Sequence, residues 1–568
     1  MDNWKVKEKK EIGSLVKMKL SSIILQLLFQ RGIDTEEKIN NFLTPDYERD
    51  ICDPFLFSDM KKATKRFRKA KEAGELVAIF GDYDADGVTS TAIIKEALDE
   101  IGIRTIIYIP DKKTEGYGMN IKAVNELKEN GVNLIITVDC GITNVEEIAK
   151  ATEYGIDVIV ADHHNIPKEL PDAFAIINPK MEKSNYPKNN LAGVGVAFKV
   201  VQALYEELIP EKKEHTKWML DLVAIGTVAD CVPLLGENRA LVKYGMVVLS
   251  KTRRVGLKEI MNVARLKIDE NNPPKSQHIS FQIAPRINAA GRMDHANTAY
   301  NLIIEKDTTK ARNLALELES NNKNRQKATQ QLVSEVRVLA NNSFKDKKFI
   351  FASGEHFSIG IVGLVAGKIA EEFNKPTAIL QKKEKISEGS FRSIPQLSII
   401  KSIEMCSELL VKFGGHDQAA GIRIENKNLE LFFKKLSAII EKELKGKELS
   451  PQIKIDAEIM AEDINFELTD QLKKLEPFGE GNQKPVFIAK KFIIKDMNLV
   501  GSSEKHLKLL LRSPNGSPKV FDAIGFNFVS KFKDLSQGDS VDVLFNLEQD
   551  EWNGTKKIQM KLIDLKKV

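Results

Sequence analysis

Three short apolar runs in the first half of the chain each end on acidic or imidazole side chains. The runs and the side chains that follow them are residues 76–80 with Asp82, Asp84 and Asp86, residues 134–138 with Asp139, and residues 156–161 with Asp162, His163 and His164. Each run is rich in Val and Ile and precedes a helical pattern, which is typical of strands in a parallel α/β sheet. Because the carboxyl ends of such strands face one crevice, we expect these side chains to converge there.

Crowded carboxylates repel one another unless cations neutralise them, so this convergence indicates a metal site. A single Asp after a strand is more often a turn residue or a helix N-cap, and only the three runs together outweigh that alternative. Residues 218–230 add a fourth member, because this mostly apolar helical run ends on Asp230. The helix dipole disfavours an anion there unless a positive group compensates; the alternative is that Asp230 only turns the chain toward Pro233.

The donor set consists of carboxylate oxygens with one or two imidazoles, which suits Mn²⁺ or Mg²⁺ better than structural zinc. Two such divalent cations that share a carboxylate would lower the pKa of a bridging water and stabilise charge on an attacked phosphoryl group. The sequence therefore predicts phosphodiester hydrolysis. Cys140 and Cys231 lie beside predicted ligands, and we interpret both as small buried side chains, because a thiolate would select a softer metal.

Four strings resemble, in order, the motifs of the DHH phosphoesterase superfamily. They are GDYDADG (81–87), VDCG (138–141), ADHH (161–164) and VAD (228–230). Six further strings are similar to those of the bacterial single-strand-specific exonucleases within that superfamily. They are LAGVGVAFK (191–199), APRINAAGRM (284–293), GIVGLVAGKIAE (360–371), FRSIP (391–395), GGHDQAAG (414–421) and LEPFGEGNQKPVF (475–487). The resemblance extends from about residue 43 to residue 564.

The resemblance implies a role for each residue of the metal site. The implied direct ligands are Asp84, Asp86, Asp139, His163 and Asp230, with Asp139 as the bridge between two cations. Asp82 is a further ligand or supports one, because the superfamily often has His where this chain has Phe80. His164 is expected to donate to a substrate phosphate and Asp162 to orient an imidazole, which makes both candidate catalytic residues. A structural histidine is the alternative for His164.

The resemblance also implies residues that hold a DNA strand. Gly414, Gly415 and His416 would bring backbone N–H groups and an imidazole to a phosphate, although a plain Gly-Gly turn is the alternative. Arg286, Asn288 and Arg292 lie in a context that we interpret as a loop suited to phosphate contact. Ser390 and Arg392 resemble a terminal-phosphate pocket, with Phe391 where a small residue is usual. Lys112 stands where the related exonucleases commonly have Arg.

The predicted fold class is α/β. A parallel-sheet DHH domain is joined by a long helix to a second α/β domain, the DHH-associated domain, and a C-terminal OB-fold β-barrel follows. The expected ranges are 1–65 for an N-terminal helical extension that decorates the first domain, 66–270 for the DHH domain, 271–343 for the connecting segment, 344–449 for the DHH-associated domain and 450–568 for the barrel. Period-two alternation in 541–545 and 557–562 around a turn at 552–555 favours the barrel.

Composition indicates the cellular compartment of the protein but says little about its function. Hydrophobic residues make up 42% of the 568 residues and charged residues 29%, and the net charge of +5 is too small to indicate a nucleic-acid partner by itself. The four cysteines show no CxxC spacing, which is typical of a reducing compartment. We find no signal-peptide or membrane-spanning pattern. We therefore expect a cytoplasmic protein that is a monomer and does not contact a membrane.

Three functions compete. The leading one is a metal-dependent 5′-to-3′ exonuclease that hydrolyses single-stranded DNA to 5′-mononucleotides in DNA repair and recombination, with a helicase and a single-stranded-DNA-binding protein as implied partners. The second is a phosphodiesterase for nano-RNA or cyclic dinucleotides, whose relatives typically lack the C-terminal barrel. The third is a non-catalytic single-strand-binding replication factor, which the four intact motifs argue against. The sequence leaves the physiological metal and activity on RNA undecided.

Overall fold

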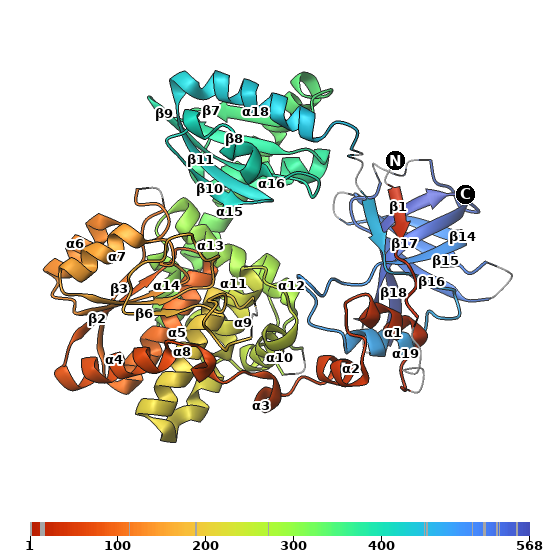
Figure 1. Cartoon of the computed structure of the whole chain (residues 1–568). Coiled ribbons are helices and arrows are strands. Elements are labelled where there is room, and N and C mark those ends of the chain that lie inside the picture. Colours follow the sequence, from red (N-terminus) through yellow and green to blue (C-terminus); the bar gives the residue numbers. More distant parts are fainter. Residues whose placement is uncertain are drawn as a thin grey trace. The chain divides into compact units, whose positions relative to one another are not determined.

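The computed structural model describes the chain except residues 1–2, 12–17, 113, 188–189, 271, 448, 450–451, 502–503, 515–517, 530–531, 533 and 553–554. The chain divides into two compact units (Figure 1). The first unit comprises residues 1–51, 231–243 and 451–568, and the second comprises residues 52–230 and 244–450. None of the described helices is both long and apolar enough to cross a membrane.

A five-stranded parallel sheet with the order β3-β2-β4-β5-β6 forms the first part of the second unit. Its strands are β2 (Leu76–Gly81), β3 (Arg104–Tyr108), β4 (Leu134–Val138), β5 (Asp157–Ala161) and β6 (Ala175–Ile177). The central strands are buried almost throughout, which explains their continuous Val and Ile runs. The chain passes from β2 to β3 on one side of β2 and then crosses to β4 on its other side. The carboxyl ends beside β2 are therefore the switch point at which such sheets bind ligands.

Helices surround this sheet and continue into a helical segment. Those that alternate with the strands are α4 (Met60–Ala73), α5 (Ala85–Ile101), α6 (Ile121–Glu129), α7 (Val145–Glu153) and α8 (Gly193–Leu208). The next ones are α9 (Leu220–Ala229), α10 (Gly236–Ser250), α11 (Val255–Val263), the short α12 (Ser276–His278), α13 (Ala284–Met293) and α14 (Asn297–Ile304). The predicted long helix is α15 (Thr308–Ser343), and the Asp307 side chain caps it by accepting from the Lys310 N–H.

The string APRINAAGRM forms a helix, so our interpretation of it as a loop is wrong. A π-helical turn (Ile279–Ile283) leads into α13, and Pro285 occupies the first turn, where a helix needs no N–H donor. Gly291 is present because of a close approach: a Cβ at this position would lie 2.6 Å from the backbone oxygen of Tyr83. The glycine therefore marks packing against the loop after β2, which sequence composition alone does not distinguish from a turn.

A second, mixed sheet with the order β10-β11-β9-β8-β7 follows α15. Its strands are β7 (Ile350–Gly354), β8 (Thr377–Lys382), β9 (Ile386–Arg392), β10 (Lys412–His416) and β11 (Ala419–Glu425), and its helices are α16 (Ile359–Phe373), α17 (Ile399–Glu404) and α18 (Leu429–Glu443). Phe391 is fully buried among Phe349 and Phe432. Because side chains alternate along β9, Ser390 and Arg392 lie on the face opposite Phe391, and Phe391 does not narrow a pocket there.

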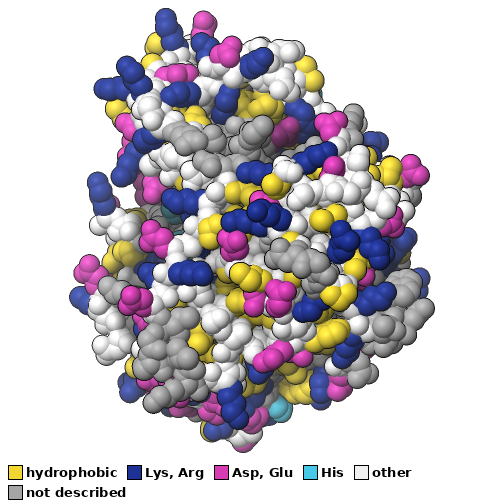
Figure 2. All heavy atoms as spheres, turned by 90° about the vertical axis from the view of Figure 1, so that its right-hand side faces the viewer, with side chains coloured by type: hydrophobic (Ala, Val, Ile, Leu, Met, Phe, Trp, Pro, Cys, Tyr) yellow, Lys and Arg dark blue, Asp and Glu magenta, His cyan; other side chains and the backbone are white. Residues whose placement is uncertain are grey.

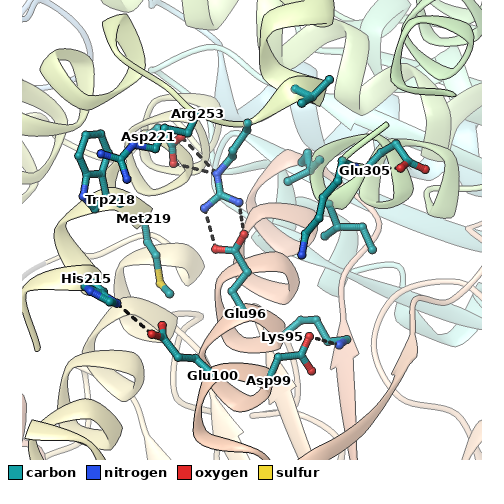
Figure 3. Close-up of a pocket in the computed structure, with 15 residues that line it drawn as sticks. Lys95, Glu96, Asp99, Glu100, His215, Trp218, Met219, Asp221, Arg253 and Glu305 are labelled. Carbon is teal, nitrogen blue, oxygen red and sulfur yellow. Dashed lines mark hydrogen bonds and ion pairs between the residues drawn. The ribbon is translucent and has the colours of Figure 1, made fainter. Parts of the chain in front are cut away.

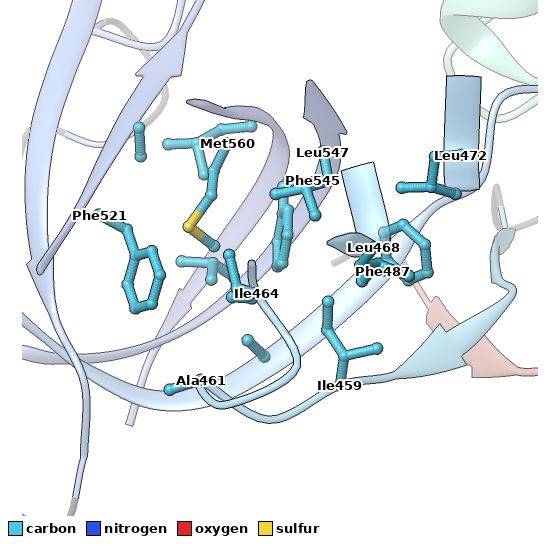
Figure 4. Close-up of a cluster of buried hydrophobic side chains, with 14 of the residues drawn as sticks. Ile459, Ala461, Ile464, Leu468, Leu472, Phe487, Phe521, Phe545, Leu547 and Met560 are labelled. Atoms are coloured by element: carbon cyan, nitrogen blue, oxygen red, sulfur yellow. The ribbon is translucent and has the colours of Figure 1, made fainter. Parts of the chain in front are cut away.

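The first unit contains a closed five-stranded barrel, as predicted for the C-terminal part. Its strands are β14 (Phe487–Val500), β15 (His506–Arg512), β16 (Val520–Gly525), β18 (Thr555–Lys567) and β17 (Ser540–Trp552), and the pairing of β17 with β14 closes the ring. Inward-facing residues such as Phe487, Phe521 and Met560 fill it together with residues of α19 (Phe466–Lys473) (Figure 4). The predicted turn at 552–555 joins β17 to β18, and its central residues lie outside the described part of the chain.

The expectation that residues 1–65 decorate the parallel-sheet domain holds only for residues 52–65, where Asp59 accepts from the Ile176 N–H of β6 and the Leu56 backbone oxygen accepts from the Ser184 hydroxyl. Residues 1–51 belong to the unit that contains the barrel. Strand β1 (Asn3–Val6) pairs in parallel with β12 (Gln452–Ile455), and α1 (Ser22–Phe29) and α2 (Glu36–Leu43) contribute residues to the barrel's hydrophobic cluster. The indole of Trp4 donates to Asp564 at 2.8 Å. Contacts between residues this far apart in the sequence leave no local pattern.

The surface is mixed in charge. Figure 2 shows Lys and Arg side chains spread over one face, with Asp and Glu side chains between them. This pattern agrees with the small net charge of +5. A nucleic-acid site must therefore be sought in particular clusters of residues and not in the overall charge.

Candidate metal centre

The loop after β2 presents two carboxylates at the start of α5. Asp84 is the N-cap of this helix, and its Oδ1 accepts from the N–H of Asp86 at 2.9 Å. Both carboxylate oxygens of Asp86 accept from the first backbone N–H groups of α8, at 2.7 Å from Gly193 and 2.8 Å from Val194. Two helix N-termini thus hold these carboxylates, since unpaired N–H groups and the helix dipole favour an anion there.

Asp139 follows β4 in the left-handed backbone region, with a φ of 60°. This conformation is uncommon for a residue with a side chain, and it points to a position that surrounding contacts enforce. One contact is the Tyr117 hydroxyl, which donates to the Asp139 carbonyl oxygen at 3.1 Å. Another is Gly193, because a Cβ there would lie 2.6 Å from Asp139 Oδ1. The glycine lets α8 pass directly over this carboxylate.

The two histidines after β5 have different partners. His163 Nε2 lies 3.1 Å from Asp139 Oδ1, and its Nδ1 lies 3.7 Å from Asp230 Oδ2. His164 Nδ1 lies 2.8 Å from Asp162 Oδ1 and 3.2 Å from the Tyr117 hydroxyl. Asp162 also accepts from the backbone N–H of His163 at 2.7 Å. His163 therefore faces the carboxylate cluster, whereas Asp162 holds His164.

These side chains form three overlapping groups whose ligand atoms lie within 4.8 Å of one another. The groups are Asp82 with Asp84 and Asp139, Asp86 with His163 and Asp230, and Asp139 with Asp162, His163 and His164. Asp139 and His163 each belong to two of them, and of these only Asp139 has a carboxylate, whose two oxygens suit a bridge. Asp230 reaches the cluster from the C-terminus of α9, where its N–H continues the helix by donating to Gly226.

Burial, followed by repulsion between neighbouring carboxylates, determines the electrostatics of the cluster. Burial and the neighbouring carboxylates raise the pKa of Asp82, Asp86 and Asp139 well above the usual value. Burial and the charge of Asp84 raise the pKa of Asp230 to about 7. Burial lowers the pKa of His163 to about 4, so its imidazole is neutral and free to act as a ligand. For His164 burial acts in the same direction, but the hydrogen bond to Asp162 and the charge of that carboxylate outweigh it, and the pKa is raised.

The donor set fits divalent cations. Asp82 Oδ1 and His163 Nε2 are buried and make no hydrogen bond with the described residues, although His163 Nε2 lies 3.1 Å from Asp139 Oδ1. Unpaired buried polar atoms are costly and require a partner, and here both face a group of carboxylates. Oxygen donors with a neutral imidazole match Mn²⁺ or Mg²⁺. The residues present are therefore suited to hold such ions.

Three cationic side chains adjoin the carboxylates. Burial and the neighbouring Arg292 lower the pKa of Lys112 to about 8, and Lys112 Nζ lies 4.7 Å from the centre of the Tyr83 ring. Arg292 is half-buried near Asp84 and donates to the backbone oxygen of Gly360 at 3.1 Å. Arg392 donates to Ser390 Oγ at 2.9 Å, and burial together with the charge of Arg292 lowers its pKa. Lys112, Arg292 and Arg392 form a positive region beside the acidic one.

Comparison with known proteins identifies the family. The DHH family N-terminal domain matches residues 76–227, the DHHA1 domain residues 346–442 and the RecJ OB domain residues 455–564. The single-stranded-DNA-specific exonuclease RecJ of Bacillus subtilis is 35% identical over 566 residues, which cover 99% of this chain and 70% of that protein. The chain belongs to the RecJ family.

Solved RecJ structures agree with this assignment. The crystal structure of RecJ from Thermus thermophilus in complex with Mn²⁺ matches with a TM-score of 0.84 and 26% identity, over all of this chain and 80% of that one. The Mg²⁺ complex of the same protein matches with a TM-score of 0.78 and 25% identity, over all of this chain and 78% of that one. The arrangement of the DHH, DHH-associated and OB domains along the chain is thus that of RecJ proteins.

Some predicted strand-binding residues have other partners in this RecJ family member. Asn288 Oδ1 accepts from the Ala85 N–H at 2.7 Å, so this side chain holds the loop after β2. Arg286 forms an ion pair with Glu319 of α15 at 2.8 Å. Gly414, Gly415 and His416 lie on the exposed edge strand β10. Among the described residues, no hydrogen bond or ion pair joins these three residues to the other predicted site residues.

Tyr117 is a site residue that sequence reasoning missed. Its hydroxyl contacts both the Asp139 backbone and the His164 ring, so it ties the loop after β4 to the loop after β5. The only local signal is its position between Gly116 and Gly118, which both have positive φ and shape the loop. A tyrosine in a glycine-rich loop has many other possible roles, so the sequence alone did not point to it.

A hollow of about 850 Å³ elsewhere in the second unit is also rich in carboxylates (Figure 3). Four of them have cationic partners: Arg254 pairs with Glu96 and with Asp221, His215 lies 2.9 Å from Glu100, and Lys95 pairs with Asp99. The Arg253 guanidinium covers the Trp218 ring at 3.8 Å. This lining is largely neutralised, and its described residues offer no set of unpaired ligands for a metal ion.

Proposed function

We propose that this RecJ family member is a metal-dependent exonuclease that hydrolyses single-stranded DNA from the 5′ end and releases 5′-mononucleotides. One observation carries the proposal. The unpaired carboxylates around Asp139 and the cations Lys112, Arg292 and Arg392 lie next to one another in the same unit. A phosphodiester needs both kinds of group: ligands for metal ions at the attacked phosphate and cations at the flanking phosphates.

The metal ligands in this proposal are Asp84, Asp86, Asp139, His163 and Asp230, with Asp139 as the bridge and Asp82 as a further or supporting ligand. Two Mn²⁺ or Mg²⁺ ions bound there would supply a hydroxide nucleophile at neutral pH and stabilise charge on the phosphoryl group. His164 would donate a hydrogen bond to a non-bridging phosphate oxygen, and its bond to Asp162 holds the ring in position. The buried N–H groups of Gly193 and Val194 fix Asp86 so that it does not have to reorganise.

End recognition falls to Ser390 and Arg392. A terminal phosphate carries more charge than an internal diester and has an extra oxygen, so a hydroxyl beside a guanidinium fork distinguishes an end from an internal position. Arg292 interacts electrostatically with Asp84 on one side of the site and with Arg392 on the other, so it is near both the metal ligands and this pair. It is therefore suited to hold the diester that follows the terminal phosphate. Gly414, Gly415 and His416 of the edge strand β10 would contact the DNA further from its 5′ end. Arg286 would contribute to DNA binding from a position that its ion pair with Glu319 fixes.

The remaining parts have supporting roles. The DHH domain spans about residues 66–270, the connecting segment 271–343, the DHH-associated domain 344–449 and the barrel 450–568. OB barrels bind single strands by stacking bases and following the phosphates, which suits a substrate without sequence preference. We further propose that the protein acts in the cytoplasm as a monomer in DNA repair and recombination, together with a helicase and a single-stranded-DNA-binding protein.

One assay tests the proposal. Single-stranded and duplex oligonucleotides labelled at the 5′ or the 3′ end are digested with Mn²⁺ or with Mg²⁺, and the first product is identified. We expect a labelled mononucleotide from the 5′-labelled single strand at the earliest time points and little product from the duplex. Mononucleotides released first from the 3′ end would refute the polarity, and cleavage restricted to di- or trinucleotides would favour a nano-RNA phosphodiesterase.

A further inference from the structure

A hollow of about 1040 Å³ adjoins the candidate terminal-phosphate pair and has no role in the function proposed above. Residues of α15, α16 and the π-helical turn before α13 line it, together with Arg392. Gly363 of α16 separates the hollow from the pair. A Cβ at Gly363 would lie 3.2 Å from both Arg392 Nη2 and Ser390 Oγ. A phosphate held by Arg392 is therefore within one side-chain width of this hollow.

Two polar atoms in the lining lack partners. Arg325 Nε and Thr329 Oγ1 are buried and make no hydrogen bond with the described residues. Thr329 is only 3% exposed, so bulk water does not readily satisfy its hydroxyl. Nearly all buried polar groups in proteins have a hydrogen-bond partner, and an exception in the wall of a hollow points to a ligand.

The lining is also positively charged. Its four cations, Arg325, Arg337, Lys368 and Arg392, outnumber its two carboxylates, Glu371 and Glu372. Arg337 pairs with Glu372 at 2.6 Å, and the other three cations form no ion pair among the described residues. Arg325 and Arg392 both feel the charge of Arg292, so the positive region beside the metal ligands extends into the hollow. A ligand that satisfies these groups must be an anion with several acceptor oxygens, such as a phosphate.

An aromatic surface lies at the same place. Phe281 lines the hollow and is 75% exposed, the highest exposure among the large hydrophobic side chains of the described chain. Exposed aromatic rings beside cations are typical of sites that stack nucleic-acid bases. The volume lies near the upper end of the roughly 300–1,000 Å³ that is usual for small-ligand sites. Phosphate-binding and base-stacking groups are thus present in one hollow.

Building on the proposed exonuclease function, we propose that this hollow binds the nucleoside 5′-monophosphate product after cleavage. Its phosphate passes from Arg392 to Arg325 and Thr329, and its base packs on Phe281. Because Arg392 lines both sites, the product clears the terminal-phosphate pair without crossing the incoming strand. The next 5′ end then occupies the vacated position.

The test measures the affinity of the full-length protein with Mn²⁺ for dTMP, with thymidine as the phosphate-free probe. Gly367 of α16 also lines the hollow, and a Cβ there would have ordinary room, 3.9 Å from Arg392 Cγ. We expect Gly367→Leu to narrow the hollow beside Arg392 and weaken dTMP binding at least tenfold, and the matched Gly367→Ala to keep it within twofold. Thr329→Val removes only the hydroxyl and should weaken dTMP binding about threefold to tenfold. Thymidine should bind at least tenfold more weakly than dTMP.

Equal dTMP affinity in the wild type, Gly367→Leu and Thr329→Val would overturn the inference, as would a wild type that does not bind dTMP or that binds thymidine equally well. If Gly367→Leu does not fold, Thr329→Val decides. Digestion of 5′-labelled single strands by the wild type separates the two proposals. Mononucleotide release with unchanged dTMP affinity in the variants refutes only the product site, whereas absence of mononucleotide release refutes the exonuclease function whatever the binding results are.

Discussion

The second unit contains two clusters of carboxylates that differ in what neutralises them. In the hollow of Figure 3, Glu96 and Asp221 share the cation Arg254. Burial alone would raise the pKa of Glu100, but hydrogen bonds from Tyr205 and His215 outweigh it, and the pKa is lowered. At the carboxyl edge of the parallel sheet, the charged neighbours of Asp82, Asp86 and Asp139 are mostly other carboxylates, and burial and this repulsion raise their pKa values. We call this group the edge cluster. Both places are acidic in composition, but only the second cluster requires a cation from solution.

The difference shows how a metal centre can be told apart from a structural ion-pair network. A network that contains its own cations contributes to stability by itself, whereas a cluster of unpaired carboxylates destabilises the fold until metal ions bind. Substituting one aspartate in each cluster by asparagine should therefore have opposite consequences. Asp139 and Asp221 form a suitable pair, because they are 3% and 2% exposed and both substitutions preserve shape while removing charge.

The largest expected effect is on activity. Asp139→Asn should reduce hydrolysis of single-stranded DNA to the background of the assay, because the bridging carboxylate is lost. Affinity for a single strand should stay within about tenfold, since phosphate contacts elsewhere supply most of the binding. Rates of product release and fluorescence anisotropy measure the two quantities.

Asp221→Asn is the control for this experiment and should keep wild-type turnover. Within the described part of the chain, the Asp221 carboxylate bonds to Arg254 and Thr252 and to no residue of the metal centre. Turnover of Asp139→Asn near that of the wild type would eliminate the bridging role. A drop of equal size in both variants would mean that the loss reflects damage to the fold.

The second effect is on stability and differs in sign. With metal removed by chelation at pH 7.5, Asp221→Asn should lower the free energy of unfolding by about 3 kcal/mol, because it leaves part of the Arg254 charge buried and unpaired. Under the same conditions Asp139→Asn should raise the Tm, because it removes one of the repelling charges. Thermal and urea unfolding of the two variants check this. Destabilisation by both substitutions would show that groups within the protein already neutralise the carboxylates of the edge cluster without metal.

The third effect extends the comparison to the cations. Arg392 has no carboxylate partner among the described residues, so its guanidinium is available for a terminal phosphate. Arg392→Ala should lower the preference for 5′-phosphorylated over 5′-hydroxyl substrates by about 1.5–3 kcal/mol, the value of a hydrogen bond between charged groups. The measured quantity is the ratio of kcat/KM for the two substrates.

Arg423 of the adjacent strand β11 is the matched control, because it already pairs with Glu388 at 2.8 Å. Arg423→Ala should leave the ratio unchanged. A wild-type ratio near unity, or a ratio that Arg392→Ala does not alter, would remove Arg392 from end recognition.

The convergence of the candidate metal ligands could be predicted from sequence because each follows a buried strand or helix whose apolar pattern is local. The parallel order of those strands is enough to bring Asp84, Asp139 and His163 together. Asp230 could be predicted from a different local signal, because it is an anion at the C-terminus of the apolar helix α9, where the helix dipole disfavours a negative charge. The fold class and the long helix α15 could be predicted for the same reason, because their patterns repeat within short windows of sequence.

Residues that act through distant partners could not be predicted in this way. The pairing of β1 with β12 and the bond from Trp4 to Asp564 join the two ends of the chain. Asn288 was expected at the substrate, but its partner is the backbone of Ala85. An amide or a tyrosine hydroxyl bonds equally well to a ligand or to a loop, and only the packed structure distinguishes the two.

The smallest expected effect is a dependence of stability on pH that only the edge cluster should show. In the metal-free protein the pKa of Asp230 is raised to about 7, and those of Asp82, Asp86 and Asp139 are raised as well, whereas unfolded aspartate titrates near 3.9. Between about pH 4 and pH 7 the folded protein therefore holds protons that the unfolded chain has released. Stability from these groups is fully present below the unfolded pKa and is lost as the pH rises through the folded pKa.

His163 works in the opposite direction, because its pKa is lowered to about 4, but its effect is complete by about pH 6.5, the unfolded value. From pH 6.5 to 7.5 the metal-free Tm should thus fall, and Mn²⁺ should raise the Tm more at pH 7.5 than at pH 5.5, since the metal competes with fewer protons. Asp230→Asn should flatten the metal-free dependence, while Asp221→Asn should lower the Tm without changing its slope with pH. Thermal unfolding at these pH values, with EDTA or with Mn²⁺, measures the metal-free Tm of the wild type and of both variants and the rise in Tm that Mn²⁺ causes. If the slopes of wild type and Asp230→Asn coincide, Asp230 already has a neutralising partner within the protein, and the contrast between the two clusters does not hold at that residue.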